Sequence, residues 1–564
     1  MTQPVLRLRW LGRVRFGDAH ALQRALHERS GDDHLLLLEH PHVYTLGVRG
    51  RLEHVLAPPN EVGAELVWTD RGGDVTYHGP GQLVGYPILS VPVAPGATPG
   101  HVHGVEQVVI DALADLGLPG ASRLDGYPGV WVGERKICAV GVRLTRGRSM
   151  HGFALNVDPD LSMFSRIVPC GIPDREVTSL AAEGVTATMR EVVDAVARRA
   201  AERWGGAGVE RQDVAWRVRS EDVSAFTKGA AAGAAPVRLI GRLAQAGVAP
   251  GDGLAADSRK PEWLRVKTDM GSRFRDLKST MRSLELNTVC EEAGCPNIFE
   301  CWADGTATFM INGERCTRAC GFCLVDTRHP EALDDGEPER VAEAVARMGL
   351  DHAVVTAVAR DDLPDGGAAA FAATVAAIHS RCPGTAVEVL IPDCKGDGAA
   401  LETIFAAGPE VLNHNLETVA RLQRAVRPSA SYARSLSVLA RAKAAGLVTK
   451  SGVILGMGET EDEVLGALVD LRAVGVDIVT VGQYLRPTSS HLPVARWWRP
   501  EEFARLREAG QEMGFAHVEA SPLTRSSYHA KAAGQAVHQP LQRADPPRQV
   551  GAGTTSTTAP QPGR

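Results

Sequence analysis

The second half of the chain alternates short apolar runs with longer amphipathic stretches. The clearest stretches with helical periodicity are residues 368–379, 432–445 and 461–473. This alternation predicts six β–α units, and therefore a parallel barrel or a partial one of the (β/α)6 TIM type. The six expected strands span residues 307–311, 353–358, 386–391, 411–414, 453–455 and 478–484.

Polar motifs follow most of these expected strands. The carboxyl ends of parallel strands meet at one edge of a barrel, so we expect the side chains of these motifs to share a site. The motifs are Arg360-Asp361-Asp362, Asp393, Asn413-His414-Asn415, Gly458-Glu459-Thr460 and Arg486.

The first 218 residues predict a separate α/β domain. Residues 34–39 and 64–69 have the composition of strands. Thr188-x-x-Glu191 is a capping box that predicts the start of a helix. Residues 219–236 are mostly small side chains, as in a linker, and residues 538–564 have so few apolar side chains that we expect disorder. The expected organisation is therefore two α/β domains, residues 1–218 and 237–537.

Composition and charge exclude several classes of protein. The chain has 564 residues, of which 44% are hydrophobic, and a formal net charge of −6, which argues against a nucleic-acid-binding surface. Residues 1–16 lack the apolar core of a signal peptide, and no apolar run is long enough to cross a membrane. We therefore expect a cytoplasmic, reducing location and no membrane partner.

Six of the ten cysteines form two triplets, Cys290-x4-Cys295-x5-Cys301 and Cys316-x3-Cys320-x2-Cys323. Dense cysteine in an intracellular chain indicates a metal rather than disulfides. Triplets favour iron–sulfur clusters, because a four-iron cluster held by three thiolates leaves one iron open. The alternative is structural zinc, which usually takes four ligands and would make this half an interaction scaffold.

The second triplet resembles the signature of radical S-adenosylmethionine (SAM) enzymes, and the first resembles the auxiliary-cluster motif of lipoyl synthase. A biotin-synthase-like sulfur inserter, the alternative within that superfamily, would lack the first triplet and the motif at residues 525–530. The resemblance to lipoyl synthase covers about residues 237–536 and is also carried by residues 291–297, 360–367, 413–418, 450–452, 456–460, 483–487 and 525–530.

This resemblance implies two [4Fe-4S] clusters and SAM. One electron from the first cluster would cleave SAM to a deoxyadenosyl radical, which would take hydrogen from C6 and C8 of a protein-bound octanoyl chain. The auxiliary cluster would supply the two sulfurs. The ligands implied are Cys316, Cys320 and Cys323 for the SAM cluster, and Cys290, Cys295, Cys301 and Ser527 (or its neighbour Ser526) for the auxiliary cluster. Candidates for SAM or substrate contacts, each of which could instead be a capping or turn residue, are Asp361, Asp362, Asn413, Asn415 and Glu417.

Three stretches of the first domain carry polar or reactive side chains. Residues 71–82 combine glycines, which allow a backbone to approach closely, with Arg71 and His78; a hairpin with a polar tip is the alternative. Lys136 precedes an apolar strand, where burial would lower the pKa of a lysine and make it usable as a base, although most such lysines are solvated. Cys170 lies between a proline and a glycine, which favours an accessible loop thiol; a core cysteine is the alternative.

Together these stretches resemble lipoate-protein octanoyltransferase, which has the fold of the biotin and lipoate ligases. The resemblance implies that Cys170 attacks the thioester of octanoyl-acyl carrier protein, with Lys136 as the base, and so forms an acyl-enzyme. Cys138 departs from the pattern, where a small residue is expected; it is interpreted as a small hydrophobe, with a rival nucleophile as the alternative. The implied acyl channel is lined by Arg71, Gly72, Gly73, Asp74, Val75, Thr76, Tyr77, His78, Ala139, Val140, Gly141, Gly152, Phe153 and Ala154.

The two resemblances describe consecutive reactions on one substrate. The first half would place octanoyl on a lysine of lipoyl carrier domains, such as the E2 subunit of 2-oxoacid dehydrogenases or the glycine cleavage H protein, and the second would convert it to lipoyl. A one-electron donor such as ferredoxin or flavodoxin is also implied. A linker would raise the effective concentration of the shared carrier domain at each site. The alternative is a first half that binds carrier domains without catalysis.

Overall fold

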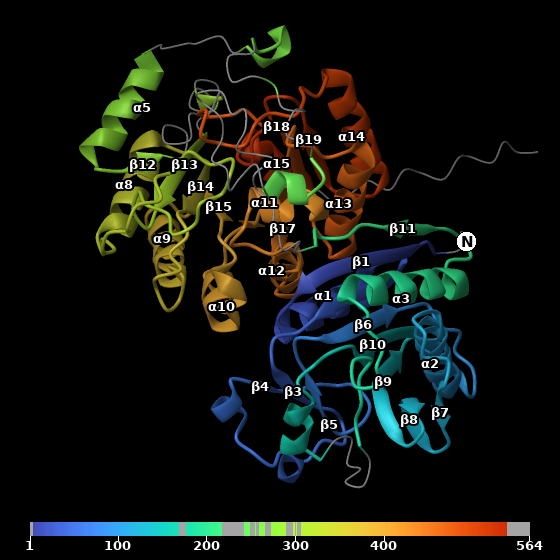
Figure 1. Ribbon diagram of the computed structural model, residues 1–564. Coiled ribbons are helices and arrows are strands. Elements are labelled where there is room, and N and C mark those ends of the chain that lie inside the picture. Colours follow the sequence, from blue (N-terminus) through green and yellow to red (C-terminus); the bar gives the residue numbers. More distant parts are fainter. Residues whose placement is uncertain are drawn as a thin grey trace, which may run out of the picture.

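The computed structural model describes residues 4–168, 176–216, 242–248, 254, 259–265, 272–288, 297–298, 301 and 306–538. Within them the chain forms two α/β units, each built around an eight-stranded sheet (Figure 1). The predicted α/β class with two units is confirmed. Among these residues, none of the helices combines the length and apolar character needed to cross a membrane.

The first sheet is mixed. The neighbouring strands β11, β1 and β2 are parallel, and each later pairing in the sheet, from β2 with β6 to β8 with β7, is antiparallel. A separate small sheet, in the order β4-β3-β5, lies beside it. The first sheet has the order β11 (Val209–Arg211), β1 (Leu6–Arg13), β2 (Asp33–Glu39), β6 (Gln82–Ile88), β10 (Arg148–Asn156), β9 (Arg135–Thr145), β8 (Tyr127–Val132) and β7 (Ala121–Leu124); the small sheet comprises β3 (Val43–Leu46), β4 (Glu65–Trp68) and β5 (Val75–His78).

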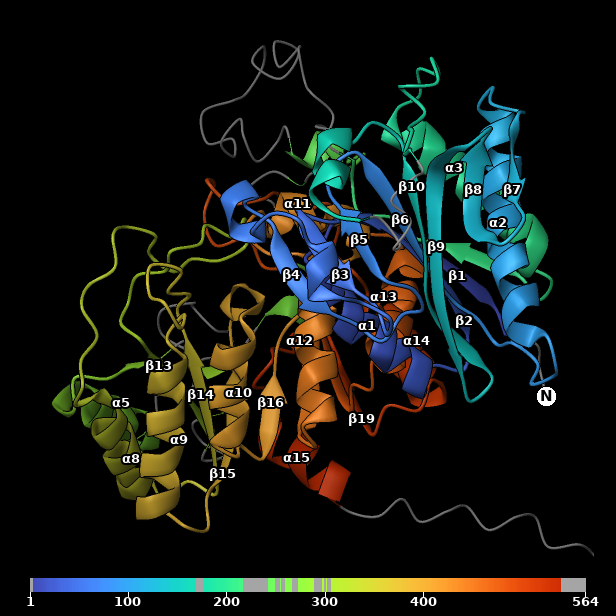
Figure 2. The ribbon, with the colours of Figure 1, turned by 90° about the horizontal axis from the view of Figure 1, so that it is seen from below.

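Helices cover both faces of the first sheet. α2 (Ala97–Asp115) and α3 (Met189–Trp204) pack against each other and the sheet, and α1 (Phe16–Arg29) lies on the opposite face (Figure 2). The predicted capping box starts α3: the Thr188 hydroxyl accepts the N–H of Glu191, and the Glu191 carboxylate accepts the N–H of Thr188. Strand alternation on β1 turns Arg9 and Leu11 toward α1, whereas Trp10 stacks on Trp216.

The second sheet is parallel from β13 to β19 and ends in one short antiparallel strand, β12. The six expected strands are present as β13 to β18. β19 adds a seventh parallel strand that its short, half-polar sequence did not indicate. The strands are β12 (Asn287–Thr288), β13 (Thr306–Ile311), β14 (His352–Ala357), β15 (Ala386–Leu390), β16 (Val411–Asn413), β17 (Val448–Leu455), β18 (Ile478–Gln483) and β19 (His517–Ala520).

Helices between these strands form an outer layer, seen as a row beside β13 to β16 in Figure 2. α15 (Ala530–His538) contacts β14 and β19, and its Ala533 packs against Val411 and Ile478 at the first residues of β16 and β18. It therefore covers the amino-terminal edge of the sheet and leaves the carboxyl edge to the polar motifs. The other helices are α5 (Ser272–Ser283), α8 (Glu337–Met348), α9 (Ala368–Arg381), α10 (Gly398–Ala406), α11 (Gln423–Val426), α12 (Tyr432–Ala444), α13 (Glu461–Ala473) and α14 (Pro500–Glu512).

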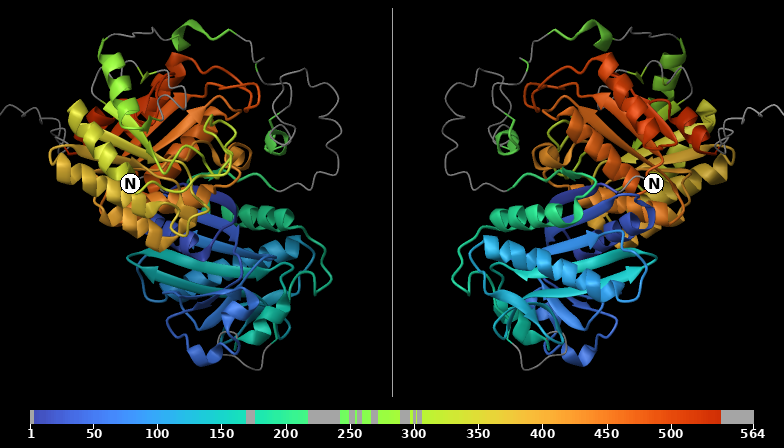
Figure 3. Two further views of the ribbon diagram at one scale, coloured as in Figure 1. Left: turned by 90° about the vertical axis from the view of Figure 1, so that its left-hand side faces the viewer. Right: turned by 90° about the vertical axis from the view of Figure 1, so that its right-hand side faces the viewer.

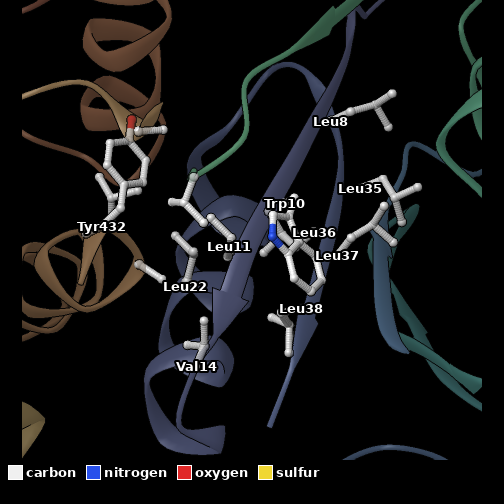
Figure 4. Close-up of a cluster of buried hydrophobic side chains, with 14 of the residues drawn as sticks. Leu8, Trp10, Leu11, Val14, Leu22, Leu35, Leu36, Leu37, Leu38 and Tyr432 are labelled. Carbon is white, nitrogen blue, oxygen red and sulfur yellow. The ribbon is translucent and has the colours of Figure 1, made fainter. Parts of the chain in front are cut away.

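The two halves lie directly against each other (Figure 3), and their buried side chains form one hydrophobic core. α1 packs against α12, and the close-up in Figure 4 shows Leu11 and Leu22 of the first half facing Tyr432 of the second. Beside them the Arg9 guanidinium makes a buried bidentate ion pair with Asp470, at 2.9 Å to each carboxylate oxygen. The interface therefore combines continuous apolar packing with a fully desolvated charge pair.

Candidate active sites

A cavity opens in the first half between β5, β6, β9 and β10. Phe16, at the start of α1, lies on its wall, as do Val84, Tyr86 and His151, which the sequence did not assign to the channel. The expected channel residues that lie on the cavity are Arg71, Gly72, Gly73, Thr76, His78, Ala139, Val140, Gly141, Gly152, Phe153 and Ala154.

Three expected channel residues lie elsewhere. Val75 and Tyr77 alternate with Thr76 and His78 along β5, so they turn away from the cavity and pack into a small apolar core. The Asp74 carboxylate accepts hydrogen bonds from the backbone N–H of Val75 and from His54. It therefore orders the loop that precedes the cavity strand.

Two glycines on the cavity wall let neighbouring backbones come together. A Cβ at Gly152 would lie 2.2 Å from the carbonyl oxygen of Gly85, and one at Gly141 would lie 3.0 Å from that of Gly72. A side chain at Gly152 would therefore force the strand apart from its neighbour, and one at Gly141 would crowd the loop at residues 71–73.

The polar side chains of the cavity are one cation, two neutral imidazoles and the hydroxyl groups of Thr76 and Tyr86. The Arg71 guanidinium is buried and donates to the Thr45 carbonyl oxygen at 2.6 Å. Burial, together with the positive charges of Arg71 and Arg143, lowers the pKa of His151 to about 3. Burial and the neighbouring His40 likewise hold the pKa of His78 well below its usual value. At neutral pH the walls suit an apolar chain that ends in one polar, electron-rich group near Arg71.

Lys136 lies on β9 with its ammonium 4.7 Å above the ring of Trp131. Cys170 lies outside the described residues, which stop at Val168 and resume at Glu176. The N–H of Val168 donates to the carbonyl of His54, and the N–H of Lys136 donates to the carbonyl of Glu176 at 2.9 Å. The described residues that flank this gap are therefore held by His54 at Val168 and by Lys136 at Glu176.

Cys138 is fully buried in the core of the first half and is not on the cavity. Burial raises the pKa of its thiol far above the ordinary value. These two facts support its interpretation as a small hydrophobe.

His20, Asp70 and His151 bring three possible metal-ligand atoms within 4.8 Å of one another. The same Asp70 carboxylate is also paired with the Arg143 guanidinium, which neutralises it. The positive surroundings disfavour a divalent cation here, and we interpret the group as a hydrogen-bonded support for His151.

In the second half, Cys316, Cys320 and Cys323 lie on one loop after β13, and none is in a disulfide. Burial raises the pKa of Cys323 to about 12, and the nearby sulfurs of Cys320 and Cys316 add to the rise. The sulfur of Cys316 accepts the backbone N–H groups of Arg318 at 3.4 Å and of Ala359 at 3.3 Å. Three clustered sulfurs with N–H donors are a donor set that fits an iron–sulfur cluster.

Arg318, inside this cysteine loop, is held by two carboxylates. Its guanidinium donates to both oxygens of Asp361 at 2.8 Å and to Asp393 at 2.6 Å. Asp362, in contrast, pairs with its neighbour Arg360. Asp361 thus supports the cysteine loop, although the sequence suggested it only as a SAM or substrate contact.

Three more candidates lie together where β16 ends. Asn413 donates to Glu388 at 3.1 Å, and Asn415 donates to Glu417 at 3.0 Å; all three are buried or nearly so. The side-chain carbonyl oxygens of Asn413 and Asn415 have no partner within the described residues. Arg427 is buried beside them and donates to the carbonyl of Asn415 at 2.9 Å.

Little of the first triplet is described, because Cys290 and Cys295 lie outside the described residues. Asn297, two positions after Cys295, donates from its side chain to the carbonyl of Leu523 at 2.7 Å. Cys301 donates its N–H to the carbonyl of Asn297, and Ser526 and Ser527 follow Leu523 in a half-buried turn. The structure thus brings the two ends of the expected auxiliary-cluster motif together.

Comparison with known proteins places each half. Residues 16–201 match the lipoyl protein ligase A/B catalytic domain, residues 252–295 the N-terminal domain of lipoyl synthase, and residues 310–471 the radical SAM superfamily. The lipoyl synthase of Rubrobacter xylanophilus is 59% identical over 48% of this chain and 85% of its own length. That of Mycobacterium tuberculosis is 56% identical over 48% of this chain and 88% of its own length. The chain belongs to the lipoyl synthase family.

Lipoyl synthase accounts for the second half, and the lipoyl protein ligase A/B catalytic domain is fused in front of it. Among solved structures, a Thermoplasma acidophilum bipartite lipoate protein ligase, described with its E2 lipoyl domain, is 20% identical with a TM-score of 0.33; the match covers 37% of this chain and 87% of that one. A radical SAM lipoyl synthase implies SAM and iron–sulfur clusters, in keeping with the clustered thiols.

Three residues around the lipoyl synthase site were given no structural role from the sequence. Arg318 gave no signal beyond its place between two cysteines. Glu388 and Lys450 form a fully buried ion pair at 2.9 Å between β15 and β17. A charged residue in the middle of an otherwise apolar strand was the available signal for Glu388, because such a charge is buried only when it is paired.

Proposed function

We propose that this protein carries out two consecutive steps of lipoyl cofactor assembly. The first half transfers an octanoyl group from octanoyl-acyl carrier protein to a lysine of a lipoyl carrier domain. The second half inserts sulfur at C6 and C8 of that octanoyl chain. The observation that carries the proposal is the joining, in one chain, of lipoyl synthase with a lipoyl protein ligase A/B catalytic domain whose cavity has largely apolar walls and one buried cation, Arg71.

In the first half, Cys170 is the proposed nucleophile. Its sulfur attacks the thioester carbonyl, the carrier-protein thiol leaves with a proton, and an octanoyl thioester on Cys170 remains. The amine of the carrier-domain lysine then attacks this thioester, Lys136 takes the proton from the amine, and the cysteine thiol is released. Arg71 is positioned to orient the acyl group, and Phe153 and Val140 contact its alkyl chain.

In the second half, Cys316, Cys320 and Cys323 hold the first proposed [4Fe-4S] cluster, which when bound supplies the electron that cleaves SAM. Asp361 orders this loop through Arg318. Asn413, Asn415 and Glu417, which lie together where β16 ends, are proposed to bind SAM or the octanoyl chain, because the amide oxygens of Asn413 and Asn415 are buried without a hydrogen-bond partner among the described residues. Cys290, Cys295, Cys301 and Ser527 hold the proposed second cluster, the sulfur source.

The proposed partners follow from these reactions. They are an octanoyl-acyl carrier protein, carrier domains such as the E2 subunit of 2-oxoacid dehydrogenases and the glycine cleavage H protein, and a one-electron donor such as ferredoxin or flavodoxin. A cytoplasmic location is proposed because the thiol ligands and the clusters need a reducing compartment.

Mass spectrometry after incubation with octanoyl-acyl carrier protein tests the first step. We expect an octanoyl adduct on Cys170 that disappears when a carrier domain is added, and no adduct in C170S. The C138S variant is the matched control and should keep the adduct. A wild-type protein with no adduct that still binds carrier domains would make the first half a binding module.

Anaerobic reconstitution followed by iron, sulfide and product analysis with an octanoyl-lysine peptide tests the second step. We expect two four-iron clusters and a lipoyl product. Zinc without iron, or one cluster that stays intact during turnover, would refute this half of the proposal and leave the adduct experiment unaffected.

A further inference from the structure

Helix α1 of the first half contacts the octanoyl site with one side and helix α12 of the second half with the other. Phe16 lies on the acyl cavity, and His20 is 3.4 Å from the Asp70 carboxylate that supports His151. Between these two residues Asp18 points the other way, into the second half, and is 2% exposed. One turn of helix therefore presents side chains to the octanoyl site and to the lipoyl synthase barrel.

Asp18 is surrounded by donors from α12. The Ser437 hydroxyl and the Arg441 guanidinium each donate to one carboxylate oxygen at 3.2 Å, and Arg434 donates to the other at 3.5 Å. This carboxylate is strongly fixed. If it moved, each of its buried partners would lose a hydrogen bond or the opposite charge that it pairs with.

From Arg434 the contacts continue into the cysteine loop. Its second nitrogen is 3.5 Å from Asp393, a fully buried carboxylate that follows β15. The other oxygen of Asp393 accepts from Arg318 at 2.6 Å, and the backbone N–H of Arg318 donates to the sulfur of Cys316. Four side chains thus connect the first half to a predicted cluster ligand.

The loop around Asp393 is held by the first half at further points. Its backbone adopts positive φ at Cys394, Lys395 and Gly396. Arg15 of the first half donates to the carbonyl of Lys395, and a Cβ at Gly396 would lie 2.9 Å from Asp18. Non-glycine residues adopt such φ values only when the surroundings enforce them, and α1 is part of those surroundings.

We propose that Asp18 is a positioning residue for the radical SAM reaction: through Arg434 and Asp393 it fixes Arg318, and with it the loop that carries Cys316 and Cys320. The inference rests on the proposed function of the second half. It makes the octanoyl-transfer domain a structural part of the lipoyl synthase site.

The test uses the full-length protein and the variants D18N and R434Q. Each variant removes one partner of the contact between Asp18 and Arg434. D470N is the matched control, because it breaks the other buried ion pair of the same interface without any contact to Asp393 or Arg318. Thermal unfolding of each iron-free protein checks folding, and should D18N fail to fold, R434Q carries the same test.

Two readouts are independent of turnover by the loaded enzyme. In the iron-free protein, hydrogen exchange of residues 316–323 should accelerate about fivefold or more in D18N and R434Q, and the double variant should add little to either single change. After reconstitution, both variants should alter the electron paramagnetic resonance change that SAM produces and raise the KM for SAM more than they lower kcat.

D470N should leave exchange of residues 316–323 and the SAM-dependent spectrum as in the wild type. A D18N and R434Q pair that behaves like the wild type would overturn the proposal, and so would a D470N variant with the same effects, because interface docking alone would then explain them. A wild-type protein that makes no lipoyl product would refute the proposed function instead.

Discussion

The buried histidines show how position sets protonation in this molecule, and Lys136 shows how a proposed base is held. Lys136 lies at the edge of β9, where its ammonium contacts the Trp131 ring and keeps part of its hydration. His151 lies inside the cavity, where burial keeps the imidazole neutral and its pKa near 3. Apart from Arg71, the described side chains on the cavity wall are therefore uncharged at neutral pH, which suits an alkyl chain, and Lys136 is the proposed base for the incoming amine.

Replacing Lys136 by methionine should remove the proposed base without changing the walls of the cavity. We expect the rate of amide formation to fall about a thousandfold, the usual range for loss of a general base, while the octanoyl adduct on Cys170 still forms slowly. Single-turnover transfer to a carrier domain measures this rate. R135Q is the matched control, because Arg135 pairs with Glu183 on the surface, and equal loss in both variants would contradict the role of Lys136.

At the scale of elements, the buried ion pair of Glu388 and Lys450 ties β15 to β17 inside the second sheet. Burial alone would raise the pKa of Glu388, but the Lys450 ammonium lowers it to about 2. Asn413 on the intervening β16 donates to the same carboxylate. The three neighbouring strands are thereby fixed in register at the point where the candidate SAM contacts begin.

Removing one partner of this pair should be far worse than removing both. K450M leaves the Glu388 carboxylate buried without its cation and should destabilise the second half by about 3–5 kcal/mol. The double variant E388Q/K450M should recover most of that loss. Thermal unfolding of the iron-free protein, with the circular dichroism signal as the readout, measures both, and a double variant as unstable as K450M would show that the cost is packing rather than charge.

The elements that the sequence predicted well are those fixed by local pattern. The capping box of Thr188 and the helix at residues 461–473 are local signals, and the structure reproduces both. β19 was missed because it is short and half polar, and its pairing with β18 is a tertiary effect. Asp18 and Arg9 gave no signal for the same reason, since their partners lie more than 400 residues away.

The whole molecule has many buried neutral histidines, and this determines its response to acid. Burial lowers the pKa of His40 to about 4, and the pKa of His414, beside Arg427, to about 4. In the unfolded chain each histidine binds a proton near pH 6.5, so the unfolded state takes up more protons between pH 6.5 and 4. Stability is therefore expected to be complete above pH 6.5 and to fall as the pH drops toward 4.

Between pH 6.5 and 5 each fully buried histidine should contribute about 2 kcal/mol to this loss. Thermal unfolding from pH 8 to 5 measures the trend. H40Q is the diagnostic variant, because an amide can keep the contacts of His40 to the Val14 carbonyl and the Tyr86 hydroxyl without titrating. A slope unchanged in H40Q would show that His40 is already accessible to protons in the folded state.

The shared core also predicts that the two halves are one folding and binding unit. Leu11 and Leu22 of the first half pack with Tyr432 of the second, and the Arg9–Asp470 pair is closed to water beside them. Domains joined only by a linker usually have small, polar contacts and move independently, whereas apolar packing of this kind resists separation.

A protease site placed within residues 219–236 tests this directly. After complete cleavage the two fragments should still elute together in size-exclusion chromatography, because burial of Leu11, Leu22 and Tyr432 does not depend on the covalent connection. The same cleavage in an L22K variant, which puts a charge against Tyr432, should let the fragments separate. Separation of the wild-type fragments would mean that covalent linkage alone keeps the octanoyl site beside lipoyl synthase, and a contact such as that of Asp18 with Arg434 would then form only transiently.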